Sequence, residues 1–229
     1  MPAWDELKRH QNHLIRKSLE GSVFAAPITA DPITALTDAT SELLALPDGY
    51  VDLGFMSDDG AQFASEVESS DVTSWGAVEP TRRDITQDVT TLQGFFQETN
   101  RMTIALYTNV DAASMTPDAT SGELVVDKPD RPATRHYRIL TIGVDLADAG
   151  EIYVARFLPR ASVTDKDDQA FQSGDDPLGW PVTMTAYKDA ALGTSERYYF
   201  GGPGWAALLA DMGFEVGNGG GGGGGGVEG

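Results

Sequence analysis

The stretch DVTSWGAVEPTRRDITQDVTTLQGFFQETNRMTIAL, residues 71–106, decides the fold. It holds the end of one segment, which begins as far back as Ala61, and the whole of a second, residues 81–98. Both are rich in Thr, Val, Ile and Phe, and Gly76 and Pro80 lie between them. Such residues are enriched in strands, whereas Gly and Pro interrupt ladders. The pattern predicts a long antiparallel hairpin. Strands of this length need partners along their edges, and neighbouring copies of the chain can supply them.

The apolar residues of both arms of this hairpin change phase midway. In the second arm the apolar positions are odd at Ile85 and Val89 but even at Leu92 and Phe96, and the first arm shows the same change before Val72. A shift of one residue is what a β-bulge produces. We therefore expect both arms to bend.

One face of the second arm carries a polar row in the sequence. Because residues two apart in a strand share a face, the row lies opposite Ile85 and Val89 and predicts a surface that meets water or a polar partner. The row consists of Asp84, Thr86, Asp88 and Thr90. The residues that we expect to contact neighbouring copies are Trp75, Val78, Pro80, Arg82, Arg83, Ile85 and Val89.

The N-terminal residues 1–49 predict a helix followed by an extended arm or loop. Apolar residues stand among charged ones over residues 4–19, as in a short amphipathic helix that ends at Gly21. Residues 23–47 contain several prolines and many Ala and Thr, and a proline pushes its preceding residue toward extended conformations. We expect this arm to add little to the core.

A β-sandwich domain is predicted for residues 50–214, because strand patterns dominate there and the helical patterns are short. Its expected elements are a strand over 50–56, a turn at 58–60, the long hairpin, a helix over 99–109 capped by Thr99, a second hairpin with arms at 134–146 and 151–164, strands over 181–188 and 197–200, and a helix over 205–212. Residues 215–229 contain a glycine run at 219–226, which predicts a disordered tail.

The composition limits the class of protein. With 229 residues and 41% hydrophobic content, the chain suits a folded soluble domain. Its 16 basic and 35 acidic side chains give a net charge of -19, which argues against a surface that grips DNA, because duplex binding relies on Lys and Arg. The absence of cysteine excludes disulfides and thiolate sites. The sequence has neither a long apolar run nor a signal-peptide pattern, so we expect no membrane partner and assembly in the cytoplasm.

The sequence predicts neither an enzyme nor a cofactor, since the motifs of nucleotide, metal and hydrolase sites are not found in it. His10 and His13 have no third ligand nearby, which favours a solvated helix face over a metal site. In the acidic loop 165–176, Ala170 stands where a calcium loop needs glycine. His136 falls within an expected strand, where a structural role is favoured over Ser-His-Asp catalysis.

Exposed tryptophans offer one alternative kind of site. Trp75 and Trp180 stand beside Gly76 and Pro181 and are candidates for a sugar-binding platform. Trp205 falls on the apolar stripe of the last predicted helix, so we expect it in the core. The alternative function is therefore a β-sandwich module that binds glycans on a virion or cell surface.

Several short motifs occur in a characteristic order along the chain: GSVFAAP at 21–27, YVDLG at 50–54, SDDG at 57–60, WG at 75–76, EPTRRDITQD at 79–88, QET at 97–99 and YF at 199–200. In this order and spacing the chain resembles, over about residues 10–214, the major tail tube proteins of long-tailed, non-contractile phages of actinobacteria. The resemblance implies a β-sandwich with a flanking helix, whose long hairpin joins those of five other copies into a β-barrel around a channel. Some relatives carry an immunoglobulin-like C-terminal domain where this chain has its glycine run.

The resemblance also implies partners and a location. Hexameric rings would stack into a tube through the N-terminal arm and loops, with tape-measure and tail-terminator proteins as further partners, in a virion tail assembled in the host cytoplasm. Double-stranded DNA would pass through the tube without sticking during ejection. The polar row on the hairpin fits the channel wall, because fixed negative charge repels phosphates.

Overall fold

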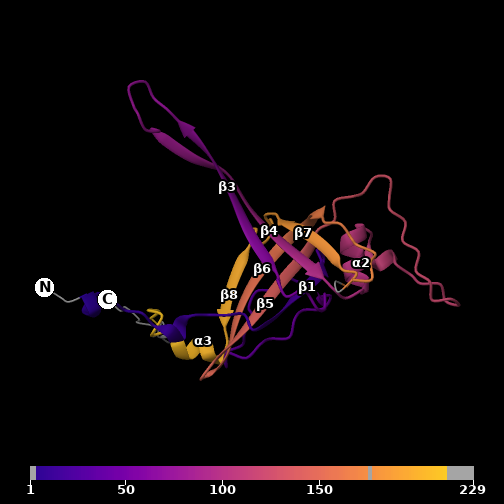
Figure 1. The fold of residues 1–229 in the computed structure, drawn as a ribbon, viewed down its shortest axis with the longest axis horizontal. Helices are drawn as coiled ribbons and strands as arrows, with labels where there is room; N and C mark the ends of the chain where they lie inside the picture. Colours follow the sequence, from indigo (N-terminus) through magenta and orange to yellow (C-terminus); the bar gives the residue numbers. More distant parts are fainter. Residues whose placement is uncertain (1–3, 175–176, 216–229) are drawn as a thin grey trace, which may run out of the picture.

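An antiparallel sheet is the framework of the computed structural model, which describes residues 4–174 and 177–215 (Figure 1). The strands run in the order β2-β1-β5-β6-β7-β4-β3, and β8 pairs with the first half of β6. The mainly β fold predicted from the sequence is confirmed. The strands are β1 (Glu20–Pro27), β2 (Val51–Asp52), β3 (Gln62–Val72), β4 (Arg82–Phe96), β5 (Tyr137–Ala147), β6 (Gly150–Lys166), β7 (Trp180–Ala186) and β8 (Arg197–Gly201).

Two layers of this sheet enclose the main core. Strands β1, β5 and the first half of β6 form one layer, and β4 with β7 form the other; β6 is long enough to belong to both. Its register against β5 shifts near the middle, since Ile139 faces Leu158 but Tyr137 faces Ala161, and such a bulge bends the strand. Buried side chains from both layers meet between them, among them Ile139, Leu158, Leu92, Phe96, Val182 and Met184.

Residues 51–57 close one side of the sandwich. The backbone N–H of Leu53 donates a 2.9 Å hydrogen bond to the carbonyl of Val23 in β1. The N–H of Ser57 then donates a 3.0 Å bond to the carbonyl of Phe95 in β4. The segment therefore joins the edges of the two layers, and the strand predicted here is shortened to β2 because the chain must cross from one layer to the other.

A second core covers the outer face of the first layer. Residues 28–50 run over this face and bury Ile33 and Leu36 against Leu140 and Phe157 of the sheet. The loop is therefore a cover for the sheet.

The prediction of an extended arm over residues 23–47 was wrong, because the first part of this segment is a strand of the sheet and the rest covers the sheet. Strand β1 pairs with β5 along its whole length and buries Val23, Ala25 and Ala26. A strand covered on both faces shows no alternation of polar and apolar residues, so the sequence does not carry the usual half-buried strand pattern there.

Helices cover parts of this framework. Helix α2 (Arg101–Thr108) contacts β7, and the helix predicted at this place is confirmed. Its N-cap is Asn100 and not Thr99, because the Asn100 side chain accepts hydrogen bonds from the backbone N–H groups of Met102 and Thr103. The expected apolar stripe of Met102, Ala105 and Leu106 is buried.

The terminal helices are shorter than predicted. The helix expected over residues 4–19 is limited to α1 (Trp4–Leu7) and a 3-10 turn, η1 (Asn12–Leu14). The apolar side chains of this segment, Trp4, Leu7, Ile15 and Leu19, are exposed, so little packing supports a longer helix. Near the other end, α3 (Pro203–Leu208) replaces the longer helix expected there, and a second 3-10 turn, η2 (Ala112–Ser114), follows α2.

Two further observations complete the description. Among the residues that the structure describes, no helix is long and apolar enough to cross a membrane. The glycine run 219–226, predicted to be disordered, lies outside the described residues.

Candidate assembly surface

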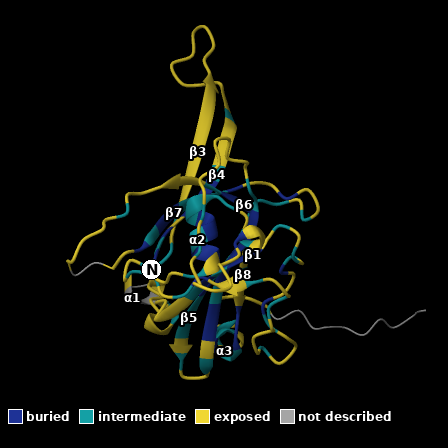
Figure 2. Cartoon of the chain, turned by 90° about the vertical axis from the view of Figure 1, so that its right-hand side faces the viewer, coloured by how far each residue is buried: buried dark blue, intermediate teal, exposed yellow. Residues whose placement is uncertain are grey.

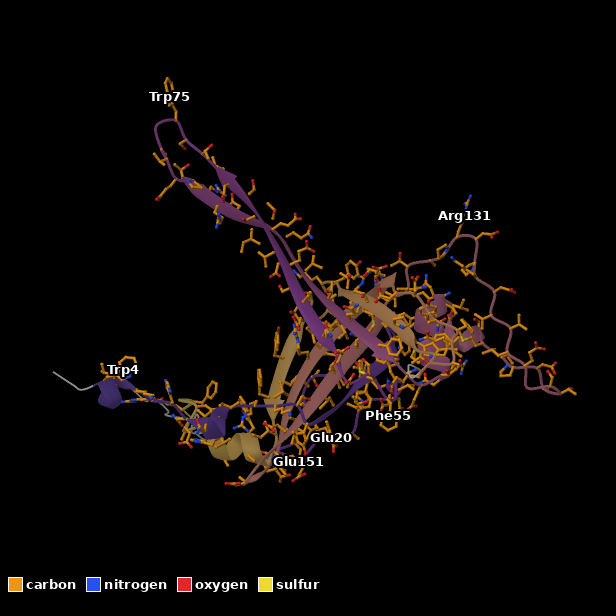
Figure 3. The ribbon with its side chains drawn as sticks, in the orientation of Figure 1. Trp4, Glu20, Phe55, Trp75, Arg131 and Glu151 are labelled. Atoms are coloured by element: carbon orange, nitrogen blue, oxygen red, sulfur yellow. The ribbon has the colours of Figure 1, made fainter. Side chains whose placement is uncertain are left out.

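The hairpin of β3 and β4 projects out of the sandwich (Figure 1). Its outer part is exposed on both faces in the single chain (Figure 2). Trp75 stands at its tip, where the whole side chains of Trp75 and Val78 are open to solvent (Figure 3). The long hairpin predicted over residues 61–98 is present, with its strands at Gln62–Val72 and Arg82–Phe96.

The register of this hairpin contains a bulge in β4. Glu68 pairs with Gln87, but the next residue, Ser69, pairs with Ile85, which leaves Thr86 without a partner. Paired residues of antiparallel strands point to the same side of the sheet, so the extra residue reverses the alternation of β4 relative to β3. The expected bulge is thus present in the second arm, whereas β3 gains no extra residue.

The bulge divides the hairpin into two faces of different chemistry. One continues from Phe63 and Leu92, which pack in the main core, and we call it the core-side face. It carries Ser65, Val67, Ser69 and Asp71 of β3 and Arg83, Ile85, Asp88 and Thr90 of β4. The opposite face, which we call the acidic face, carries Glu66, Glu68, Ser70 and Val72 of β3 and Arg82, Asp84, Gln87 and Val89 of β4.

The predicted polar row does not share one face. Asp88 and Thr90 lie on the core-side face, Asp84 lies on the acidic face, and Thr86 is the unpaired residue of the bulge. The prediction was wrong because it continued a strict alternation through the bulge. The acidic residues that do line up are Glu66 and Glu68, on the neighbouring strand.

The predicted contact residues fall into three places. Trp75, Val78 and Pro80 lie in the exposed tip, Arg83 and Ile85 on the core-side face, and Arg82 and Val89 on the acidic face. Ile85 and Val89, which the sequence pattern put on one face, are therefore on opposite faces. Their role in contacts between copies stays a prediction.

Each face of the hairpin holds one exposed ion pair. On the core-side face Arg83 Nε lies 2.7 Å from Asp71 Oδ1, and this hydrogen bond lowers the pKa of the Asp71 carboxyl. On the acidic face Arg82 Nε lies 2.7 Å from Asp84 Oδ2. Exposed pairs of this kind add little stability. The acidic face nevertheless has a net negative charge, because it carries the three carboxylates of Glu66, Glu68 and Asp84 but only one guanidinium, that of Arg82.

Arg156 of β6 fixes the root of the hairpin. Its guanidinium carbon lies 3.8 Å from the ring centre of Phe63 in β3 and 4.8 Å from that of Tyr198 in β8. Arg156 Nε donates a hydrogen bond to Glu196, whose other carboxylate oxygen accepts a 3.1 Å bond from Thr90 of β4. Burial and the charge of Glu196 raise the pKa of the Tyr198 hydroxyl. The cluster connects β3, β4, β6 and β8 where the two layers separate.

An exposed aromatic row begins at this cluster and was missed in the sequence. Its rings follow one another with centroid distances of 6.4 Å, 5.0 Å and 6.2 Å. We call this set, Tyr198, Phe200, Trp205 and Phe214, the aromatic row. The sequence predicts Trp205 in the protein core, but the residue is only half-buried and its ring stacks on Phe200 of the edge strand β8. The sequence holds one signal of this row: Tyr198 and Phe200 are two residues apart in a strand, so their side chains lie on the same face.

The tryptophans considered as a sugar platform do not come together. Trp180 packs edge-on against Tyr107, and its Nε1 donates a 3.2 Å hydrogen bond to Thr99. Trp75 stands alone at the far tip of the hairpin, and Trp205 belongs to the aromatic row (Figure 3). The arrangement offers no shared face for a sugar ring.

The other candidate groups have structural contacts. The Nε2 atom of His136 lies 3.0 Å from a guanidinium nitrogen of Arg160, and burial together with this charge lowers the pKa of His136. His13 pairs with Asp211 at 3.1 Å. Within residues 4–174 and 177–215 no group of three or more His, Asp or Glu side chains is placed to hold a metal ion.

The projecting hairpin and the exposed apolar side chains define a class of protein. A sandwich that extends two strands well beyond its own core, and leaves large apolar side chains exposed on them, is built to assemble with other subunits. A family model described as phage tail tube protein matches residues 10–200 of the chain. The chain therefore belongs to the phage tail tube protein family and is a structural component of a bacteriophage virion that self-assembles into a tube.

Two other comparisons complete this result. A crystal structure titled as that of an Hcp protein is similar over 79% of this chain and 99% of that chain, with 10% sequence identity and a TM-score of 0.31. A comparison with curated proteins gives no match.

Proposed function

We propose that the chain forms hexameric rings, that these rings stack into the tail tube, and that the tube conducts DNA during ejection into the host. The observation that carries the proposal is the division of the hairpin into a core-side face and an acidic face. The number six follows the resemblance of the sequence to tail tube proteins of long-tailed phages.

The edges of the hairpin support pairing between copies. Among the described residues, β3 is the last strand of the sheet and pairs only with β4. An exposed edge of this length is a template for further pairing, and closure into a barrel removes all such edges. Because the two edges of the subunit differ, contacts between copies are heterologous, and heterologous contacts close into rings when the rotation allows it.

The acidic face is the one that suits the channel wall. The core-side face continues the apolar interior and carries Val67 and Ile85, so it is suited to contact with protein. The acidic face carries Glu66, Glu68 and Asp84 and has no such continuity with the core. Repeated around each ring, its negative charge disfavours a bound phosphate backbone. DNA can then pass without sticking.

The remaining assignments rest on the resemblance. They are assembly in the host cytoplasm, a host among the actinobacteria, and tape-measure and tail-terminator proteins as partners of the tube.

Electron microscopy of the concentrated purified protein tests the proposal. We expect rings or tubes whose end views average with sixfold symmetry around an open channel. A protein that stays monomeric at all concentrations, or assembles with a different symmetry or without a channel, contradicts the proposed function.

A further inference from the structure

The inner face of β8 is only half covered by the chain. Tyr198 pairs with Arg156 and Phe200 pairs with Val154, so these side chains lie on the same face of the layer as Leu158, which is fully buried in the main core. Tyr198 and Phe200 are nevertheless 52% and 50% exposed. A face that belongs to the interior of the sandwich here opens to solvent.

The opposite face of β8 is covered in the usual way. Tyr199 points to the second core, and its hydroxyl donates a 2.7 Å hydrogen bond to the carbonyl of Ile33 in the covering loop. The exposure of Tyr198 and Phe200 is therefore specific to the inner face. The aromatic row continues over α3 through the half-buried Trp205 to Phe214, which is 55% exposed. Contiguous exposed aromatics of this kind mark an interaction surface.

The core-side face of the hairpin is also left exposed. Its core-side face continues from the buried Leu92, but Val67 and Ile85 on that face are 56% and 70% exposed. In the rest of the molecule the core-side face of the second layer covers the inner face of the first layer. Arg156 sits between Phe63 and Tyr198. Beyond it, the hairpin extends the second layer and β8 extends the first layer, and neither is covered by the other.

The two uncovered faces cannot cover each other within one chain. The hairpin of β3 and β4 rises to the upper left, whereas the end of β8 and α3 lie at the lower left (Figure 1). Trp75 at the hairpin tip and Glu151 beside α3 mark these diverging ends (Figure 3). Each face therefore needs a cover from outside the chain.

We propose that the core-side face of the hairpin of one copy covers the aromatic row of a neighbouring copy in the same ring. The sandwich is then completed in trans, with Val67 and Ile85 of one subunit packed on Tyr198 and Phe200 of the next. The contact is heterologous, because hairpin and row are different surfaces, and each copy both gives a hairpin and receives one. This inference rests on the proposed ring and names the surface that receives the hairpin.

The same contact agrees with the channel assignment. A hairpin that turns its core-side face outward to the aromatic row of its neighbour turns its acidic face to the ring axis. One arrangement therefore covers the two apolar surfaces and exposes the carboxylates of Glu66, Glu68 and Asp84.

Cross-linking between engineered cysteines tests the contact, and the chain contains no natural cysteine. Packed sheets lie about 10 Å apart, too far for a disulfide, so a short bifunctional thiol reagent is used. Chains with Val67→Cys are mixed with chains with Phe200→Cys and allowed to assemble. We expect covalent dimers in the mixture, none with either variant alone, and a ladder up to six copies when one chain carries both changes.

The matched control moves one cysteine to the other face of the same strand. Glu66→Cys, adjacent to Val67 but on the acidic face, is combined with Phe200→Cys. We expect at least tenfold less cross-linked product from this pair. Equal yields from the two pairs, or no product from Val67→Cys in particles that microscopy shows to be assembled, overturn the inference while leaving the proposed function intact. Failure of the wild-type protein to form rings overturns the proposed function instead.

Two substitutions keep the test decisive if cysteine at position 200 impairs assembly. Phe200→Leu retains an apolar contact, whereas Phe200→Ser does not. We expect Phe200→Ser to raise the concentration needed for ring formation at least tenfold and Phe200→Leu to raise it by less. If Phe200→Ser assembles at the same concentration as the wild type, the hairpin of the neighbouring copy does not pack on the aromatic row.

Discussion

At the scale of single residues, one buried guanidinium holds three segments together. Arg138 of β5 donates hydrogen bonds to the carbonyls of Ala30 at 2.8 Å and Pro159 at 3.0 Å, and lies 3.4 Å from Asp189 Oδ2. The backbone N–H of Leu192 also donates to the Asp189 carboxylate. The hydrogen bond from Leu192, together with the charge of Arg138, lowers the pKa of Asp189. The covering loop, β6 and the turn after β7 therefore depend on one ion pair.

Replacing Asp189 tests this ion pair. Asp189→Ala should lower the free energy of unfolding by about 3 kcal/mol, because it leaves a buried guanidinium without its counterion. Asp189→Asn keeps an acceptor oxygen and should cost less. The depressed pKa of Asp189 stabilises the fold above the unfolded pKa of about 3.9, and this part is lost as the pH falls through the folded value. Urea unfolding should show that the difference between wild type and Asp189→Asn shrinks in acid. A difference independent of pH would contradict this assignment.

Replacing Arg156 tests whether this residue stabilises the root of the hairpin. Arg156→Leu removes the guanidinium between Phe63 and Tyr198 and leaves the half-buried Glu196 without its cation. We expect a loss of about 1–3 kcal/mol in unfolding free energy and faster hydrogen exchange in the root of the hairpin. Arg82→Leu, which breaks an exposed pair in the same hairpin, is the control and should change neither. Equal effects of the two changes would show that Arg156 does not fix the root.

At the scale of elements, the sequence predicts what alternation or helical spacing encodes locally. Both hairpins and α2 are found where the pattern puts them. Strand β1 was not predicted, because it is covered on both faces and ends in a proline. The bulge at Thr86 shows the limit for the candidate site: the phase change indicates that a bulge exists, but its exact place decides which carboxylates share a face. The aromatic row joins residues of β8 and α3, and only the tertiary structure brings these together.

The covering loop is an element whose importance can be measured. Ile33→Ala should cost about 2–5 kcal/mol in unfolding free energy, because Ile33 is buried against Leu140 and Phe157 in the second core. Leu43→Ala, in the same loop but 43% exposed, is the control and should cost much less. Thermal unfolding followed by circular dichroism measures both. A protein that tolerates Ile33→Ala without loss would show that the loop is a dispensable arm.

At the scale of the whole molecule, repetition of the acidic face in an assembly adds the fields of many single carboxylates. A single exposed carboxylate has little effect on DNA beyond a screening length of roughly 8 Å at physiological salt. In a closed ring the acidic face of each hairpin is repeated by every copy, and in a tube by every ring. A closely spaced array on a confining wall therefore produces a field that no single carboxylate produces. The negative charge of the chain then acts as a property of the assembly.

Reversing the charge of the acidic face tests that property. Glu66→Lys combined with Glu68→Lys changes only side chains of this face and leaves Val67 and Ile85 in place, so tubes should still form. The channel should then hold DNA, because lysines attract phosphates, and particles carrying the change should release their genome more slowly. Raising the salt concentration should partly restore the rate, since screening weakens this attraction.

The control for this experiment carries the same charge change elsewhere. Glu123→Lys with Asp127→Lys alters two exposed side chains of the loop between η2 and β5, far from the hairpin, and should release DNA at the wild-type rate. Microscopy confirms that both variants form tubes, and DNA release from purified particles is then followed over time. If the two variants release DNA at the same rate and with the same salt dependence, the acidic face does not line the channel.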